Sequence, residues 1–97
     1  MEYRINISNK RIELPQRGYF CEGDSGESIE VIASFLAINF IGYEAKIGVK
    51  IDDMLGDYFG KNLKAWIKEF QRANNLEQDG CIGPITLNKL REYGLSL

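Results

Sequence analysis

The sequence predicts a single small, mainly α-helical domain with a β-hairpin added at its N-terminus. The chain has 97 residues, which is enough for one hydrophobic core but not for two. Apolar residues make up 44% of it, a share typical of folded globular domains rather than of disordered chains. Two kinds of periodicity divide the chain: apolar and polar residues alternate before residue 15, and apolar residues recur at helical spacing in three later segments.

The alternating segment, residues 3–14, is the expected hairpin. Residues 8–11 interrupt the alternation, and Asn9 among them tolerates the backbone angles of a turn. Pro15 should end the hairpin, because proline has no amide hydrogen to donate to a ladder. We therefore expect residues 1–22 to form a hairpin and a lead-in loop, and residues 23–97 to form the helical domain.

Three helices are expected, over residues 25–41, 61–73 and 84–93. The first follows Asp24, a capping residue type, and apolar residues cover most of its circumference. Such a helix lies at the centre of a fold or is partly covered by another molecule. The second is clearly amphipathic, and Trp66 on its apolar face is expected in the core. The third begins at Pro84, which suits a first helical position, and Gly94 should end it.

The connection between the first two helices has a less regular pattern. Ile47, Val49 and Ile51 alternate with small or polar residues, which predicts a short strand there.

Two cysteines and the lack of histidine limit the chemistry available. Cys21 and Cys81 are separated by 60 positions, and a small domain that depended on disulfides would carry several pairs. We therefore expect buried thiols rather than a bridge. A zinc site without histidine would need carboxylate ligands, so neither a metal nor another cofactor is expected.

The charge pattern argues against nucleic acids and membranes as partners. The formal net charge is −2 and the basic residues are scattered, whereas nucleic-acid binders usually carry a clustered basic face. No apolar run is long enough to span a bilayer. The first residues lack the basic start and apolar centre of a signal peptide, so any export of the protein would depend on something else.

Several motifs follow one another in an order typical of one family. They are Gly23-Asp24-Ser25-Gly26, Phe59-Gly60, Phe70-Gln71 and the run from Asp79 to Thr86. In order and spacing, this series resembles the three-helix peptidoglycan-binding domains of bacterial and phage cell-wall hydrolases. Residues 14–20 also resemble the approach to such domains in endolysins of clostridial type.

The resemblance implies a fold and a function. The fold would be a three-helix peptidoglycan-binding bundle, carrying the added hairpin. The function would be non-catalytic binding of peptidoglycan, through its glycan or its stem peptide, which targets a tethered endolysin or autolysin to its substrate. The protein would then act at the bacterial cell wall, outside the cell.

Five residues in two loops are the candidate ligand contacts: Asp57, Tyr58, Lys61, Asp79 and Thr86. Each loop begins a helix, and helix starts present free backbone amides that suit the carboxylates of a wall peptide. Tyr58 precedes an expected core phenylalanine, so its ring should point outward, and Lys61 is placed to pair with a carboxylate. Asp79 and Thr86 fit turn or cap acceptors better than direct contacts. We expect the two loops, residues 57–61 and 79–86, to lie together.

Two other classes of function were weighed against wall binding. An enzyme would need two facing carboxylates, a zinc site or a cysteine–histidine pair. Asp52, Asp53 and Asp57 form the one acidic cluster of interest, and they are better explained as solvated loop residues, so we expect no catalysis. The other class is an interaction module that keeps the fold without the ligand. The apolar first helix favours this alternative and would allow a homo-oligomer.

Overall fold

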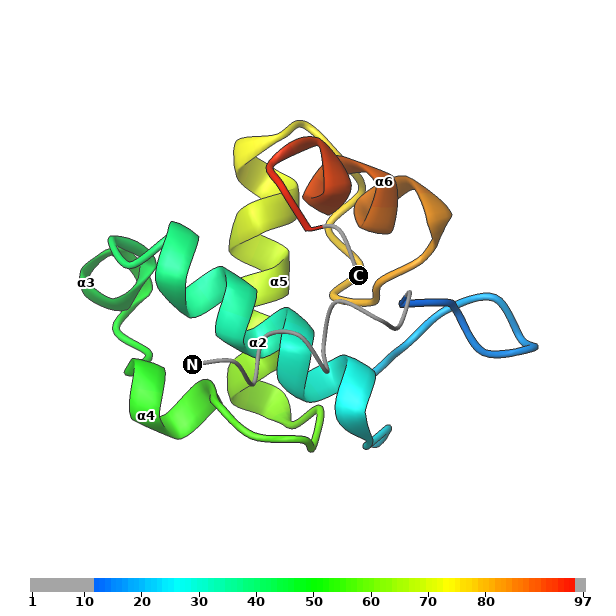
Figure 1. Cartoon of the computed structure of the whole chain (residues 1–97). Coiled ribbons are helices and arrows are strands. Elements are labelled where there is room, and N and C mark those ends of the chain that lie inside the picture. Colours follow the sequence, from blue (N-terminus) through cyan, green and yellow to red (C-terminus); the bar gives the residue numbers. More distant parts are fainter. Residues whose placement is uncertain (1–11, 96–97) are drawn as a thin grey trace.

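The computed structural model describes residues 12–95, and this part of the chain is mainly helical (Figure 1). It contains five helices and no sheet; two isolated β-bridges, Phe20 with Ile82 and Ser25 with Tyr58, are the pairings among these residues. The expected hairpin over residues 3–14 lies outside the described residues except for residues 12–14, which form no strand.

The three expected helices are present, with bounds close to those predicted. They are α2 (Glu27–Asn39), α5 (Lys61–Ala73) and α6 (Pro84–Glu92). Helix α2 is shorter than expected by two residues at each end. Gly26 has φ 132°, which is incompatible with a right-handed helix, and Phe40 leaves the helix with φ −131°. The mainly helical fold class is therefore confirmed.

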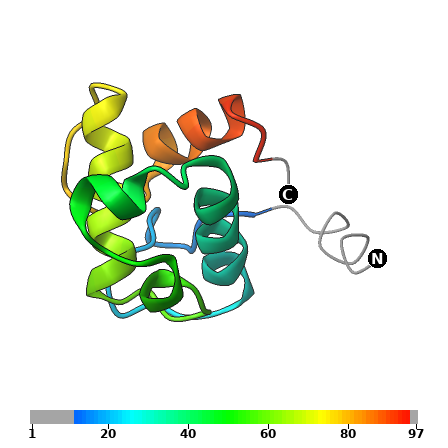
Figure 2. The same cartoon turned by 90° about the vertical axis from the view of Figure 1, so that its left-hand side faces the viewer.

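Helix α5 carries the centre of the hydrophobic core. Its fully buried residues Trp66, Ile67 and Phe70 join one cluster with apolar residues of α2 and α6. In Figure 2, α5 runs along the left-hand side of the molecule, and α2 and α6 lie across from it. The apolar face that the residue spacing predicts for α5 therefore packs against the other helices and stabilises the domain.

Aromatic rings join the ends of the three helices. The Phe40 ring meets the Phe70 ring edge-on, with centroids 5.4 Å apart, and the Tyr93 ring edge-on at 5.2 Å. Phe40 also stacks on Tyr43, with centroids 5.2 Å apart. Such edge-on and offset arrangements are the favourable ones for aromatic pairs, so this cluster fixes how the C-terminal ends of α2 and α6 meet α5.

The prediction of a strand between the first two long helices is wrong. The chain forms two short helices there, α3 (Tyr43–Ile47) and α4 (Ile51–Met54), and both pack on α5. Gly48 ends α3 with φ 73°, and the Glu44 side chain accepts a hydrogen bond from the Ile51 amide at 3.0 Å. The Val49 carbonyl accepts a hydrogen bond from Trp66 Nε1 at 3.0 Å. The alternation of apolar and polar residues over positions 47–51 comes from the end of α3, the start of α4 and the residues that link them.

An ion pair and a partly buried tyrosine hold α3 to α5. Arg72 donates to both carboxylate oxygens of Glu69, at 2.9 and 2.7 Å, and Lys46 of α3 lies 3.9 Å from the same carboxylate. The hydrogen bonds from Arg72 lower the pKa of Glu69. Burial raises the pKa of Tyr43 to about 12. Glu69 is therefore held in its ionised form, and Tyr43 in its neutral form, at neutral pH.

The lead-in segment, residues 12–25, packs along the helices. Ile12 is buried, and its carbonyl accepts a hydrogen bond from Arg91 Nη2 of α6 at 2.7 Å. Phe20 exchanges backbone hydrogen bonds of 3.0 and 2.8 Å with Ile82. Farther along, the Phe59 amide donates to the Asp24 carbonyl at 2.8 Å. This segment therefore connects the loop before α5 with the loop before α6.

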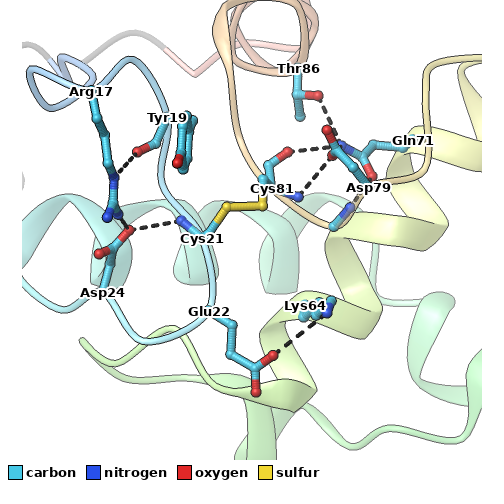
Figure 3. The surroundings of a disulfide bond; sticks show 11 residues. Arg17, Tyr19, Cys21, Glu22, Asp24, Lys64, Gln71, Asp79, Cys81 and Thr86 are labelled. Carbon is cyan, nitrogen blue, oxygen red and sulfur yellow. Dashed lines mark hydrogen bonds and ion pairs between the residues drawn. A yellow bond between two sulfur atoms is a disulfide. The ribbon is translucent and has the colours of Figure 1, made fainter.

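The expectation of free cysteines is wrong, because Cys21 and Cys81 form a disulfide bond (Figure 3). Their Cα atoms lie 4.6 Å apart, within the range for a bridge. Cys21 directly follows Phe20, and Cys81 directly precedes Ile82. Because Phe20 and Ile82 form an antiparallel β-bridge, the paired backbones place the two sulfur atoms together. Their separation of 60 in the sequence gave no sign of this proximity.

Candidate functional site

The first hollow combines three of the five predicted site residues. It has a volume of about 390 Å³ and lies where the chain passes from α4 to α5. Its lining comprises residues 53–58 and 60–63, and thus includes Asp57, Tyr58 and Lys61. The loop over residues 57–61 thus contributes all three of its candidate residues to this hollow.

Tyr58 is presented to solvent by the backbone around it. Its side chain is 59% exposed, whereas the neighbouring Phe59 is fully buried. Backbone hydrogen bonds of 2.8 Å join Asp57 to Gly26, and both backbone groups of Phe59 to the segment before α2. A β-carbon at Gly60 would lie 3.4 Å from the Tyr58 ring, so the ring rests over the start of α5. A fixed backbone therefore holds an exposed aromatic ring at the edge of the first hollow.

The start of α5 has polar groups that the described part of the chain leaves without a side-chain partner. Its N-cap is Gly60, which makes no side-chain cap, and the first turn contains no acidic residue. Within residues 12–95, the side chains of Tyr58 and Lys61 make no hydrogen bond or ion pair. Asn62 donates to the Asp53 carbonyl at 3.1 Å and so ties α4 to α5. The first hollow thus has a frame held by internal bonds, on which the side chains of Tyr58 and Lys61 are available to a ligand.

The second hollow contains the other two predicted residues, Asp79 and Thr86. It has a volume of about 180 Å³ and is lined by Leu76, Glu77, Asp79, Cys81 and residues 83–86. It shares no lining residue with the first hollow, so the structure does not place the two loops in one site. The lead-in segment connects the two loops, because it bonds to Ile82 at Phe20 and to Phe59 at Gly23 and Asp24.

Gln71 organises the loop around the second hollow (Figure 3). This residue of α5 is buried, and its Nε2 lies within hydrogen-bonding distance of three acceptors: Asp79 Oδ1 at 3.0 Å, the Cys81 carbonyl at 2.9 Å and Thr86 Oγ1 at 3.1 Å. Its Oε1 accepts a hydrogen bond from the Gly80 amide at 3.0 Å. Asp79 and Thr86 therefore use side-chain oxygens to hold the loop, as turn and cap acceptors do.

Sequence reasoning did not assign Gln71 a role. The signal was available, because position 71 falls on the same face as the buried positions 67 and 70 of an amphipathic helix. A polar residue on that face needs buried partners, and the loop after α5 supplies them. Gly80 completes the contact: its φ is 75°, and a β-carbon there would lie 2.8 Å from Lys64 Cγ. The loop can approach α5 so closely because residue 80 has no side chain.

Two classes of feature are absent from the part of the chain that the structure describes. No group of three or more acidic or cysteine side chains comes close enough together to hold a metal ion. No helix there has the length and apolar character needed to cross a membrane.

Comparison with known proteins assigns the family. Residues 25–90 match the family model of a peptidoglycan binding domain. The chain belongs to this family. It is also 36% identical over 73 residues to the zinc D-Ala-D-Ala carboxypeptidase of Streptomyces albus G. That alignment covers 75% of this chain and 26% of the carboxypeptidase, so the chain spans about a quarter of that relative's length.

In this peptidoglycan binding domain, the matched region begins at Ser25 and ends at Leu90. It therefore includes the loops of both hollows, together with Gln71. Residues 12–24, with Cys21, precede the matched region but pack on the same core.

Proposed function

We propose that this domain binds bacterial peptidoglycan without cleaving it, and thereby holds a tethered cell-wall hydrolase, such as an endolysin or autolysin, on its substrate. Membership of the peptidoglycan binding domain family is the observation that carries the proposal. In the carboxypeptidase relative, the similar stretch is part of a larger enzyme, which supports the idea of a tethered catalytic domain.

The first hollow is the proposed ligand site, and its groups suit a wall polymer. The exposed Tyr58 ring can cover the apolar face of a sugar or a lactyl group. Lys61 can pair with a carboxylate of the stem peptide, and the free amides at the start of α5 favour the same charge. Asp57 can accept hydrogen bonds from amide or hydroxyl groups.

The second hollow has a supporting role in this proposal. Asp79 keeps Oδ2 for a ligand, because its internal bonds use Oδ1. Thr86 is buried and contributes through its bond to Gln71. Weak binding at each site is sufficient, because a repeating polymer raises the effective concentration of a tethered enzyme near its bond.

The disulfide supports a location outside the cytoplasm, at the bacterial wall. Disulfides form and persist in oxidising compartments and are rare in the cytosol. The Cys21–Cys81 bridge connects the lead-in segment to the loop before α6. A domain exported to the wall would keep this bridge, and its fold would benefit from the covalent link.

An interaction module is the second candidate function. Ile38 and Ile41, at the end of α2, are 78% and 65% exposed. Exposed isoleucines on one helix end can mark a contact surface for another domain or for a second copy. Sedimentation across a concentration range tests self-association. A protein that stays monomeric at every concentration would rule out the homo-oligomer.

A pull-down with purified peptidoglycan from several species tests wall binding. The parent should sediment with the walls, and Tyr58→Ala and Lys61→Ala should each reduce the affinity by about tenfold. Lys89→Ala is the control, because Lys89 lines none of the hollows and pairs with Glu92 on α6. The parent should leave the turbidity of the wall suspension unchanged. A parent that stays in solution with every wall type would refute the proposal.

A further inference from the structure

A third hollow lies between the lead-in loop and the start of α2. It has a volume of about 400 Å³ and is lined by Pro15, Gln16, Arg17, Phe20, Asp24 and Ser25. Five of these six residues precede the region that matches the family model.

Arg17 and Asp24 form a fixed donor–acceptor pair in this hollow (Figure 3). The Arg17 guanidinium forms an ion pair with Asp24, donates from Nε to the Tyr19 carbonyl at 3.1 Å, and lies 4.9 Å from the centroid of the Tyr19 ring. Asp24 Oδ2 also accepts the Cys21 amide at 2.8 Å, and the disulfide fixes the position of Cys21. Both side chains are therefore held in place before any ligand arrives, which lowers the entropy lost on binding.

Each member of the pair keeps one unused polar atom. Within residues 12–95, Arg17 Nη1 and Asp24 Oδ1 make no hydrogen bond, and the Gln16 and Ser25 side chains have no partner. Pro15 and Phe20 supply apolar surface beside them. The third hollow thus offers donors and acceptors next to an apolar wall.

This combination suits a neutral ligand with several hydroxyl or amide groups. Asp24 would repel a carboxylate bound near Arg17, and Arg17 would repel a protonated amine bound near Asp24. Adjacent charged donors and acceptors make strong hydrogen bonds to neighbouring hydroxyls or to an N-acetyl group. The apolar wall suits the carbon-bound hydrogens of a sugar ring.

The third hollow adjoins the first hollow. Ser25 lines the third hollow, Tyr58 lines the first, and these two residues form an antiparallel β-bridge. A polymer that extends from the first hollow into the third would therefore pass over this bridge.

We propose that the third hollow is a second subsite, which takes a neutral N-acetylated sugar of the glycan strand while a neighbouring unit occupies the first hollow. The proposal rests on the proposed function, since it assigns part of the same polymer to a further place on the domain.

Titration of the full chain, with its disulfide intact, separates the two kinds of ligand. The probes are glycan strands freed of peptide by an amidase, and free stem peptides, each followed by NMR. Arg17→Met should weaken glycan binding by about tenfold and leave stem-peptide binding unchanged, because one charge-assisted hydrogen-bond donor is lost. Lys89→Met is the matched control, since it also replaces a cation paired on the surface by an uncharged chain.

A second variant covers the case in which Arg17→Met disturbs the lead-in loop. Gln16→Ala removes a side chain that makes no internal bond, so the fold should be unaffected and glycan binding should fall by about fivefold. Retention of parental glycan affinity by Gln16→Ala and Arg17→Met together would overturn the subsite. So would a parent that binds stem peptides but not glycan strands, and that outcome would leave the proposed function standing. A parent that binds neither probe nor whole walls would overturn both.

Discussion

The loops that begin α5 and α6 share a local design but differ in how they use their polar groups. Each loop places a fully buried apolar residue, Phe59 or Ile82, before a glycine N-cap that makes no side-chain cap. Each also bonds through its backbone to the lead-in segment. In the loop before α6, Asp79 and Thr86 bond to Gln71, whereas the side chains of Asp57 and Tyr58 before α5 make no hydrogen bond or ion pair within residues 12–95. The same turn can therefore support a fold or present a ligand site.

The difference follows from what lies beneath each loop. Gln71 and the disulfide anchor the loop before α6, so its polar side chains complete an internal network. The loop before α5 is fixed by the buried Phe59 ring and by backbone hydrogen bonds to residues 23–26, so the side chains of Asp57 and Tyr58 are not needed for support. Ligand contact and structural support are thus assigned to different loops, and the following experiments test this division.

The largest effect is expected from loss of the disulfide. Replacing Cys21 and Cys81 together by alanine should lower the free energy of unfolding by about 4 kcal/mol, because the bridge closes a loop of 60 residues. Urea unfolding of the oxidised protein and the double variant measures the difference. Hydrogen exchange should rise more in residues 79–83 than in residues 57–60. Equal acceleration in both loops would show that the bridge does not support one loop selectively.

The next largest effect is expected from Gln71→Leu. This change keeps the volume but leaves the Gly80 amide and the Cys81 carbonyl without their partner, at a cost of about 2–3 kcal/mol. Thermal unfolding gives the stability, and wall pull-down below the melting temperature gives the binding. Binding close to that of the parent is expected, since the first hollow is untouched. A folded variant that has lost wall affinity would assign the ligand to the second hollow.

The sequence was most informative where one physical requirement dominates. The bounds of α5 follow from its apolar face, and the outward position of Tyr58 follows from the burial of Phe59. The disulfide could not be predicted, because it depends on how the lead-in segment crosses the loop before α6. Helices α3 and α4 were missed because alternation over five residues fits a strand as well as two helix ends. For the candidate site, the division of the five predicted residues between two hollows could not be predicted, because it depends on how the two loops pack.

A smaller effect is expected from acid. Hydrogen bonds from the Cys21 amide and Arg17 lower the pKa of Asp24, and those from Arg72 lower the pKa of Glu69. Since these pKa values are lower in the folded than in the unfolded chain, the ionised forms stabilise the fold at neutral pH. This contribution to stability is lost as the pH falls from about 4, the usual pKa of a carboxyl group, through the lowered pKa values of Asp24 and Glu69.

Variants of the two carboxyls separate their contributions. Asp24→Asn, in the third hollow, and Glu69→Gln, at the α3–α5 contact, should each reduce the acid-induced loss of unfolding free energy by about 0.5–1 kcal/mol, which flattens the acid limb of a melting-temperature profile. A profile that keeps the parental slope in both variants would show that other carboxyls cause the acid sensitivity.

The smallest effect on stability, and the sharpest test of the difference between the two loops, comes from one exposed side chain in each of the first two hollows. Tyr58 in the first hollow is 59% exposed, and Ile85 in the second is 70% exposed. Because neither side chain fills the core, Tyr58→Ala and Ile85→Ala should each change the free energy of unfolding by less than about 0.5 kcal/mol. Wall affinity should fall only for Tyr58→Ala, since Ile85 borders a loop whose polar groups serve the fold. The reverse result, with Ile85→Ala weakened and Tyr58→Ala unchanged, would exchange the roles of the two loops.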